Sequence, residues 1–545
     1  MPPRPTPNGT VRSFRKLSKD YFLQTFEMFP IAGSVAGLKE FNDKLGRPTS
    51  ATHERHAKLA RETLAAIEAA PMHAFEGDDE IDRRLMLAHL RRGEILDGEM
   101  RQWRTNPQVH LDRAADSIHH LLVRNADDLR PVAEAIVARV RAFPRFLDEA
   151  IECVERPVPL WAELTAQAAP GVCALLDSIV EPLAAASRHR AERLREWSKS
   201  AADAVRAYAA RVARRRAGEA DGYSLGTERF ERLMRERLGM NLNAREAVAA
   251  AEGLAARLKA ELKIEARRHH PRKSAAEILE EAAELWRPRG KDLLDAYRRT
   301  TDRVRARFER AGAMTFPEGD RLLVKPVPDF MVHQFPTAAY SSPGPLDKNQ
   351  TGVFWVNDLS LRRETEAEKR AEIAQHFGMD LTAAHEAYPG HHLQFVTQFK
   401  HPSFARKMAD HAIYYEGWTL WCEQMSIDLK ISNNPFARLI QLHDALWRAN
   451  RIVIDCGLHT GALTFEGACK RLEREVGFTP GRARVDVNWY TSAPTVPMSY
   501  LLGKMELMRL KRLRVDRGGW SLKRFNDWVL SFGAVPWSWI EASGI

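Results

Sequence analysis

The sequence is poor in cysteine and has no cysteine pair with metal-binding spacing. Its 545 residues include five cysteines, and no two of them form a CxxC motif. A disulfide-rich secreted domain needs an even, conserved-looking set of cysteines, and a zinc finger needs paired ones, so neither class fits. We expect reduced thiols, as in a cytoplasmic protein, at Cys153, Cys173, Cys422, Cys456 and Cys469.

The sequence also lacks the long apolar segments of exported and membrane proteins. The N-terminal stretch MPPRPTPNGTVRSFRKLSKDYF carries charge without an apolar core, and no uninterrupted 18-residue apolar run follows it. A signal peptide and a membrane span both require such segments. We therefore expect a cytoplasmic protein without a membrane partner, whose residues 1–18 form a disordered tail.

Charge of a single sign is not concentrated anywhere in the chain. The 82 Lys and Arg residues outnumber 72 Asp and Glu residues, giving a net charge of +10, but the two signs are interleaved. The clusters 214–216 and 267–270 are interpreted as solvated helix faces and turns. No stacked-aromatic or recognised nucleic-acid motif accompanies them, so no nucleic-acid partner is expected.

A helical pattern extends from about residue 19 to 311. Ala, Leu, Glu and Arg dominate there, and apolar residues recur at three- and four-residue intervals. Asn243 is a good N-cap for a helix over 244–268. No repeat of fixed period is present, which argues against a solenoid. The other clearest helices are predicted over 56–69, 79–98 and 131–156.

The pattern changes at about residue 312. Six prolines between Pro317 and Pro345 rule out long helices, and the runs 321–327 and 352–357 have the composition of strands. The second run, GVFWVN, is a candidate edge strand for binding a peptide backbone, with a buried structural strand equally open. Helices resume near 362 and are broken by a loop at 479–497. The fold class is therefore mainly α with a small β-sheet.

The octet HEAYPGHH at 385–392 carries the strongest functional signal. Zinc peptidases use HExxH, in which two histidines hold the metal and the glutamate, here Glu386, is the general base. After His385, however, the next histidines come at offsets six and seven. A regular helix would place His391 about 240° around the axis and His392 about 10 Å along it. Because Pro389 breaks or widens the helix, we prefer His391 as ligand and keep His392 as the alternative.

A third protein ligand is needed, and Glu416 is the candidate. It lies among aromatic residues in YYEGWTLWCE, 25 residues after His391, and Glu423 follows on the same helical face. A buried carboxylate needs a partner, and a cation is a good one. Gly417 would let a neighbouring element approach closely. Ion pairs of both glutamates with arginines are the alternative.

Farther on, Arg448, Arg451, Asp455 and His459 form one stripe on a helix that begins near 434. His459 could donate a hydrogen bond to an oxyanion, with Asp455 fixing its tautomer. A structural salt-bridge network explains the same spacing. Two tyrosines, Tyr490 and Tyr500, flank the 494–497 loop and are further candidates.

These segments resemble a bacterial protein family, the domain-of-unknown-function family 885. The likeness covers HEAYPGHHLQ, YYEGWTLWCE, RIVIDCGLHTGALTFEGA and PTVPMSYLLGK, in that order. The family pattern HExxPGHxxQ is met through His391 and Gln394, and EGWxLxxE is met by Glu416 and Glu423. The family looks like gluzincin zinc peptidases, and its fold is similar to the carboxypeptidase Taq family. One departure is 494–500, PTVPMSY, where the family usually resembles PGQAxSY.

The resemblance implies a large helical metallopeptidase-like body with its small sheet next to the zinc helix. Residues 19–311 would form an N-terminal helical half and 312–545 the zinc-site half of one carboxypeptidase-Taq-like body.

One Zn²⁺ would be held by His385, His391 and Glu416, with Glu423 supporting them. The implied activity is hydrolysis of short peptides or amides by a carboxypeptidase or dipeptidase, and a homodimer is left open. Glu386, His459 and Tyr500 would have catalytic roles. The substrate would be bound by Arg451 and Tyr490, with Arg448 or Lys504 as alternatives to Arg451. A non-catalytic helical scaffold with a structural metal site is the rival.

Overall fold

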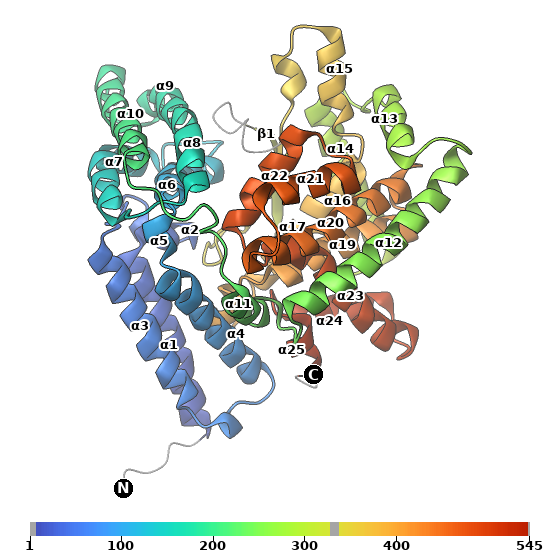
Figure 1. The fold of residues 1–545 in the computed structure, drawn as a ribbon, viewed down its shortest axis with the longest axis horizontal. Helices are drawn as coiled ribbons and strands as arrows, with labels where there is room; N and C mark the ends of the chain where they lie inside the picture. The colour runs from blue at the N-terminus through green and yellow to red at the C-terminus, as the bar shows by residue number, and fades with distance from the viewer. Residues whose placement is uncertain (1–6, 328–336, 543–545) are drawn as a thin grey trace. The chain divides into compact units, whose positions relative to one another are not determined.

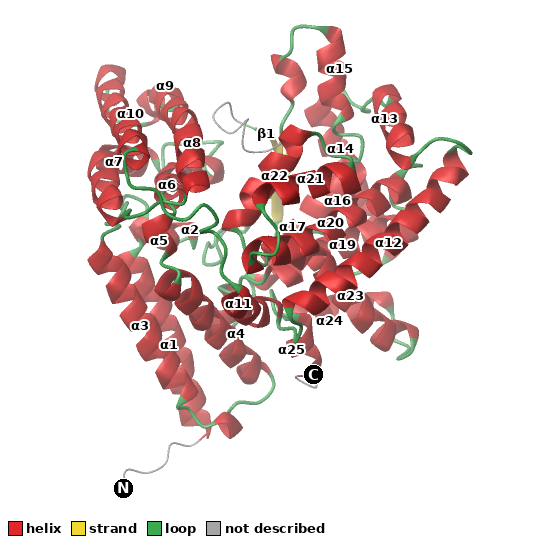
Figure 2. Cartoon of the chain, viewed as in Figure 1, coloured by secondary structure: helices red, strands yellow, loops and turns green. Residues whose placement is uncertain are grey.

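The computed structural model describes residues 7–327 and 337–542. Helices make up most of these residues, and strands form a single small sheet (Figure 2). The predicted fold class, mainly α with a small sheet, is confirmed. The chain divides into two compact units. Unit 1 contains residues up to 222 together with 343–350, and unit 2 contains most of the rest, from Tyr223 onward.

Unit 1 is helical throughout (Figure 1). Helix α10 packs against α7, α8 and α9. The segment 343–350 joins this unit through a backbone hydrogen bond of 2.8 Å from Leu346 N to Ala36 O. The helices are α1 Pro7–Met28, α2 Pro30–Val35, α3 Ser50–Glu68, α4 Asp78–Gly93, α5 Gln102–Thr105, α6 Gln108–Arg124, α7 Ala133–Cys153, α8 Pro159–Ser178, α9 Val180–Ala186 and α10 Ala191–Ala213.

The expected disordered tail is wrong for residues 7–18, because α1 begins at Pro7. Thr10, Phe14, Ser18 and Tyr21 are buried at intervals of four, four and three residues, which is the spacing of one helix face. Tertiary packing of this face stabilises a helix that its charged composition had obscured. Residues 1–6 lie outside the described residues.

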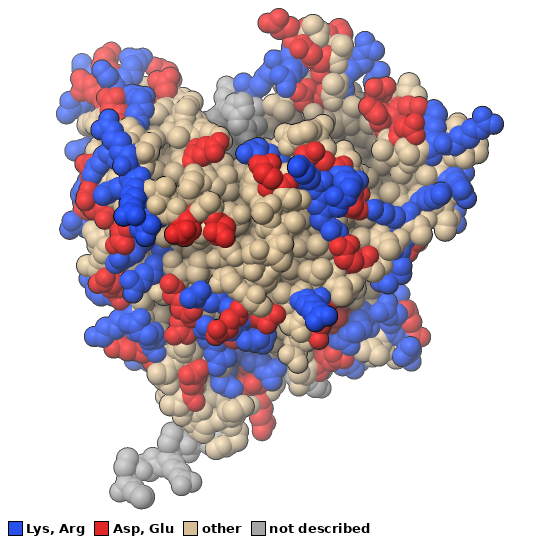
Figure 3. Space-filling model, in the orientation of Figure 1, with Lys and Arg blue, Asp and Glu red and all other residues tan. Residues whose placement is uncertain are grey.

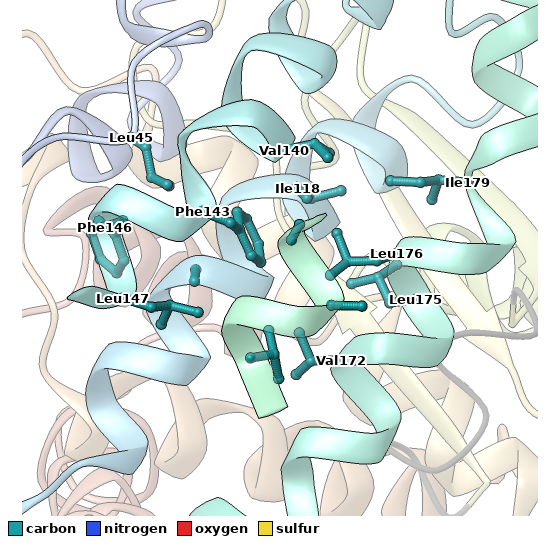
Figure 4. Close-up of a cluster of buried hydrophobic side chains, with 14 of the residues drawn as sticks. Leu45, Ile118, Val140, Phe143, Phe146, Leu147, Val172, Leu175, Leu176 and Ile179 are labelled. Atoms are coloured by element: carbon teal, nitrogen blue, oxygen red, sulfur yellow. The ribbon is translucent and has the colours of Figure 1, made fainter. Parts of the chain in front are cut away.

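The core of unit 1 lies between α6, α7, α8 and α10. Phe143, Leu147, Ile118 and Leu176 point into it (Figure 4), and each is at most 2% exposed. By length and composition alone, 159–186 is apolar enough to cross a membrane, although charged residues interrupt its apolar run. It forms α8 and α9, whose apolar residues contribute to this core, so its composition is weak evidence for a membrane span.

Unit 2 contains the remaining helices and the sheet. Its elements are α11 Thr227–Leu238, α12 Ala244–His269, α13 Ala275–Leu285, α14 Leu293–Ala311, β1 Arg321–Pro326, β2 Ala338–Ser341, β3 Thr351–Val356, α15 Glu366–Ala374, α16 Met379–Glu386, α17 His391–Gln398, α18 Phe404–Lys407, α19 Ala412–Asp428, α20 Ala437–Thr460, α21 Phe465–Val476, α22 Pro480–Ser492, α23 Val496–Lys511, α24 Leu522–Ser531 and α25 Trp537–Ala542.

The boundary between the units falls at 222/223, whereas the sequence suggested 311/312. Helix α12 packs against α20, and α14 packs against α16 and β1, so α11–α14 belong with the later helices. The change of composition at 312 marks the start of the sheet and not a domain boundary. Asn243 caps α12 in a capping box with Glu246, as its sequence predicted.

The sheet has the order β1-β3-β2, with β1 parallel and β2 antiparallel to β3. The GVFWVN run forms β3, the central strand, and Phe354 is fully buried there. The interpretation of this run as an edge strand is therefore wrong, and its buried structural alternative is confirmed. The sequence analysis missed β2, a four-residue strand at an edge of the described sheet.

The expected loop at 479–497 is also wrong, because most of it is helix α22. Thr479 caps this helix with its side chain, and Pro480 occupies the first turn, where its missing N–H costs nothing. A proline at this position starts a helix and does not break one.

Candidate metal centre

The octet 385–392 interrupts the helix completely instead of widening it. Helix α16 ends at Glu386 and α17 begins at His391. A Cβ atom on Gly390 would lie 1.8 Å from the backbone O of His385, so only glycine fits where the chain crosses the end of α16. The indole N–H of Trp418, on α19, donates to Pro389 O at 2.8 Å and fixes this connection.

The interruption brings His385, His391 and Glu416 together. One ligand atom from each lies within 4.8 Å of the others, and Glu416 Oε2 is 3.7 Å from Nε2 of both histidines. Tetrahedral zinc with bonds of about 2.05 Å separates its ligands by about 3.3 Å, so little movement would be needed. Glu416 Oε2 is buried and accepts no hydrogen bond in the structure. A buried acceptor in this state fits a cation.

Glu423 contacts His385 through Nδ1, the ring nitrogen that does not face Glu416. Its Oε1 lies 2.8 Å from His385 Nδ1, which leaves Nε2 directed at Glu416. Burial lowers the pKa of His385, but the neighbouring carboxylates of Glu416 and Glu423 outweigh it and raise the pKa to about 10. The donor set therefore attracts positive charge, and a carboxylate behind a metal-binding imidazole is the usual way to fix its orientation.

His392 takes no part in this cluster. Its Nδ1 is 3.0 Å from the Tyr340 hydroxyl, and its Nε2 is 3.3 Å from Asp320 Oδ2. Of the two neighbouring histidines that the sequence left open, the structure places His391 with His385 and Glu416.

Glu386 follows His385 at the end of α16 and is half-buried. Burial raises its pKa to about 7, with His385 lowering it and Glu416 raising it further. A hydrogen bond from the backbone of Tyr340, on β2, lowers it in turn. A carboxylate with a pKa near neutrality is suited to accept and return a proton.

Helices α19 and α23 approach closely enough for Tyr500 to reach Glu416. A Cβ atom on Gly417 would lie 2.5 Å from Gly503 C, and one on Gly503 would lie 2.1 Å from Ile413 O. Glycine at both positions therefore permits the contact, as predicted for Gly417. Burial, and then the nearby Glu416 carboxylate, raise the pKa of Tyr500 well above its ordinary value.

Arg451 lies beside Tyr500 within a group of aromatic rings. Its guanidinium is 3.9 Å from the ring centroid of Trp447 and 4.8 Å from that of Tyr500, and its Nε donates to the Tyr490 hydroxyl at 3.0 Å. Arg448 is also buried, 4.0 Å from Glu423. The structure thus places two guanidinium groups near the cluster. Lys504 is half-buried, and burial lowers its pKa to about 8.

Tyr490 is engaged elsewhere. Its hydroxyl donates to Asp486 at 2.8 Å and accepts from Trp447 and Arg451. These three contacts occupy the hydroxyl, so the structure gives Tyr490 no free group for the substrate-binding role predicted for it.

The role predicted for His459 is corrected. Its ring nitrogens face the backbone carbonyls of Tyr490, at 3.0 Å, and Tyr223, at 3.3 Å, and the side chain is fully buried. Asp455 is 3.6 Å away and instead accepts from Thr495 N and Met498 N at the start of α23. With both nitrogens occupied, His459 cannot donate to an oxyanion, so the structural alternative describes this end of the stripe.

Sequence reasoning missed Tyr340, Asp320 and Trp418 as parts of the site. Tyr340 lies on the short strand β2, and Asp320 precedes β1, so neither shares a local pattern with the octet. Their contacts with it span 52 and 72 residues, respectively. Only Trp418 carried a signal, because it belongs to the EGW motif.

Two solved structures show the same fold across almost the whole chain. A "putative lipoprotein of unknown function" from Shewanella oneidensis has a TM-score of 0.76 at 18% identity, covering 97% of this chain and 99% of that one. A "putative lipoprotein" from Colwellia psychrerythraea has a TM-score of 0.75 at 17% identity, covering 98% of each. No curated protein matches the chain.

These relatives correct the expectation of a cytoplasmic protein. Both are described as putative lipoproteins, whereas the expectation of a cytoplasmic protein rested on the few cysteines and on an N-terminal stretch without an apolar core. Neither feature excludes a lipoprotein, so the expectation of a cytoplasmic protein is wrong.

The family comparison agrees with the motifs. The model of the family described as "Bacterial protein of unknown function (DUF885)" matches residues 30–543, which include the octet, Glu416 and Tyr500. The match covers nearly the whole chain, and the chain therefore belongs to this family.

Proposed function

We propose that the protein is a zinc-dependent hydrolase of peptide or amide bonds that acts on short peptides. The observation that carries the proposal is the buried set of His385, His391 and Glu416, with Glu386 next to it. Two imidazoles and one carboxylate leave a tetrahedral zinc ion one open position, which is typical of catalytic sites. The resemblance of the motifs to gluzincin peptidases and to the carboxypeptidase Taq family supports the same chemistry.

Zinc would supply Lewis acidity toward a carbonyl oxygen and lower the pKa of water. Glu386 would take a proton from the attacking water and pass it to the leaving amine, a role for which its pKa of about 7 is suited. The Tyr500 hydroxyl, which lies near the Glu416 carboxylate, would donate to the oxyanion that develops on the carbonyl. Glu423 would hold His385 in place throughout.

The surrounding charges favour a substrate with a free carboxylate. Arg451 and Arg448 are both buried beside Tyr500, and guanidinium groups bind carboxylates in a bidentate manner. Strand β2 packs beside α16 at an edge of the described sheet. An extended peptide could add to β2, which replaces β3 as the candidate for backbone binding. A carboxypeptidase or dipeptidase fits both features.

The proposed partner is therefore a small peptide or amide. On the face drawn in Figure 3, Lys and Arg are interspersed with Asp and Glu. The expectation of no nucleic-acid partner stays a prediction from the sequence.

The decisive experiment is Glu386→Gln, which keeps the side chain's shape and removes the base. The zinc-loaded variant should keep its metal and its folding stability but lose peptide hydrolysis by at least about 10²-fold. Zinc is measured by elemental analysis, and activity with a library of short peptides that have free C-termini. Glu366→Gln, at an exposed position of α15, is the matched control and should retain full activity.

Two outcomes would contradict the proposal. If the zinc-loaded wild type cleaves no peptide, dipeptide or acylated amino acid, the protein is better described as a helical scaffold with a metal site. If Glu386→Gln cleaves as fast as wild type, the assigned mechanism fails.

A further inference from the structure

The second histidine of the octet, His392, belongs to a buried polar network that the proposed reaction does not use. It is fully buried, with Tyr340 at Nδ1 and Asp320 at Nε2. The Asp320 carboxylate favours the tautomer that carries the proton on Nε2, which leaves Nδ1 to accept from the Tyr340 hydroxyl. The contacts therefore run from Tyr340 through His392 to Asp320, the last as a 3.3 Å ion-pair contact outside hydrogen-bond geometry.

Asp320 is itself held from two sides. The Tyr388 hydroxyl donates to Asp320 Oδ2, and Arg305 Nη2 lies 3.4 Å from Oδ1. Arg305 also donates to the Tyr388 hydroxyl at 2.9 Å and covers its ring at 4.5 Å. Tyr388 and His392 both come from the octet, so Asp320 anchors the interrupted segment at two points.

At the other end of the network, Tyr340 touches two groups of the metal centre. Its ring stacks against that of His391 with centroids 6.4 Å apart and planes 15° apart. Its backbone bonds the Glu386 carboxylate. A Cβ atom on Gly352 would lie 2.5 Å from both the Tyr340 hydroxyl and His392 Nδ1, so β3 leaves room for this pair and for nothing larger.

We propose that Asp320, His392 and Tyr340 form a positioning relay that orients the ligand His391 and the base Glu386. The inference rests on the proposed function for the role of Glu386, but its effect on metal binding stands without it. His391 needs such support because its Nδ1 is buried and has no hydrogen-bond partner, whereas Glu423 orients His385 directly. Stacking against Tyr340 takes the place of that second hydrogen bond.

The test compares Tyr340→Phe and His392→Leu with wild type. Zinc affinity, measured by competition with a chromophoric chelator, should fall about 10-fold in both, the lower end of the usual effect of supporting residues. At saturating zinc, kcat should also fall about 10-fold while KM changes less than about twofold, because Glu386 is displaced and substrate contacts are not. His392→Asn, whose amide can replace Nδ1, should recover most of the zinc affinity.

Tyr21→Phe is the matched control, since it removes another tyrosine–histidine hydrogen bond, 3.3 Å from Tyr21 to His56, within unit 1. It should leave zinc affinity and kcat unchanged. If His392→Leu fails to fold, Tyr340→Phe, which removes one oxygen atom, still decides the question.

Three results would overturn the relay. The first is wild-type zinc affinity and kcat in both variants, and the second is an equal loss in Tyr21→Phe. The third is complete loss of zinc in His392→Leu, which would make His392 a ligand. A wild type that binds zinc but cleaves no peptide contradicts the proposed function alone, because the affinity comparison can still be made.

Discussion

In unit 1, α7 and α10 bury mainly apolar side chains, among them Phe143, Leu147 and Val205, each at most 2% exposed. Helix α7 also buries Arg139, which donates to backbone carbonyls. In unit 2, the corresponding interior of α19 and α20 buries Glu416, Glu423 and Arg451, each between 6% and 8% exposed. The first interior follows from the hydrophobic effect. The second opposes it, because buried ion pairs are often less stable than apolar side chains of the same size. Charges kept at that cost are consistent with the metal site that we propose in unit 2.

The largest effect should come from the apolar interior. Phe143→Ala should lower the free energy of unfolding by about 3–5 kcal/mol, the transfer and cavity cost of a buried phenylalanine. Urea denaturation followed by circular dichroism measures it. The folded protein should still bind zinc with wild-type affinity. A loss of zinc from folded Phe143→Ala would contradict this separation of the two units, because the apolar core of unit 1 would then also support the metal centre.

In the interior of α19 and α20, a substitution should weaken zinc binding more than it lowers the stability of the fold. Glu423→Ala removes the partner of His385 and should weaken zinc binding by about 10–100-fold, or about 1.4–2.8 kcal/mol, with a smaller effect on unfolding of the metal-free protein. Chelator competition measures the affinity. Asp428→Ala, on the same helix and bonded to Gln424, is the control and should bind zinc normally. Equal affinities in both variants would mean that Glu423 is only an ion-pair partner.

The stability of unit 2 should also depend on pH, because Asp320 has a lowered pKa in the folded protein. Burial raises the pKa of Asp320, but its contacts with His392, Tyr388 and Arg305 outweigh it and lower the pKa from 3.8 to about 2. A lowered folded-state pKa stabilises the protein above the unfolded value, and that stability is lost as the pH falls toward 2. The loss should be about 2 kcal/mol. Denaturation midpoints at pH 5 and 2.5 measure it, and Asp320→Asn should show a correspondingly weaker pH dependence. An identical dependence in both proteins would exclude Asp320 as its source.

The smallest effect is expected at the start of α12, which belongs to neither of the two interiors. Asn243→Ala removes the side chain that caps α12 and should cost about 1 kcal/mol of stability. Thermal unfolding measures it, and Asn243→Ser should recover most of the loss. A cost above about 3 kcal/mol would show that this residue does more than cap the helix.

Several features could be predicted because they depend on neighbouring residues. The cap at Asn243, the strand at β3 and the helical class follow from local hydrogen bonding and side-chain periodicity. The HExxPGH and EGWxLxxE patterns likewise identified the three residues that the structure brings together as a metal-binding set. Pro480 shows the limit of local rules, since a proline can start a helix as well as end one.

The sequence by itself determined the fold class, the family and the residues with metal-binding chemistry. Tertiary structure decided which of them meet: it placed His391 in the cluster and His392 behind it, and it directed His459 to two backbone carbonyls. It also made β3 the central strand and supplied Tyr340 from β2. The physical reason is that helix and strand formation involve residues a few positions apart. Packing instead joins side chains that are tens to hundreds of residues apart, at distances no local pattern encodes.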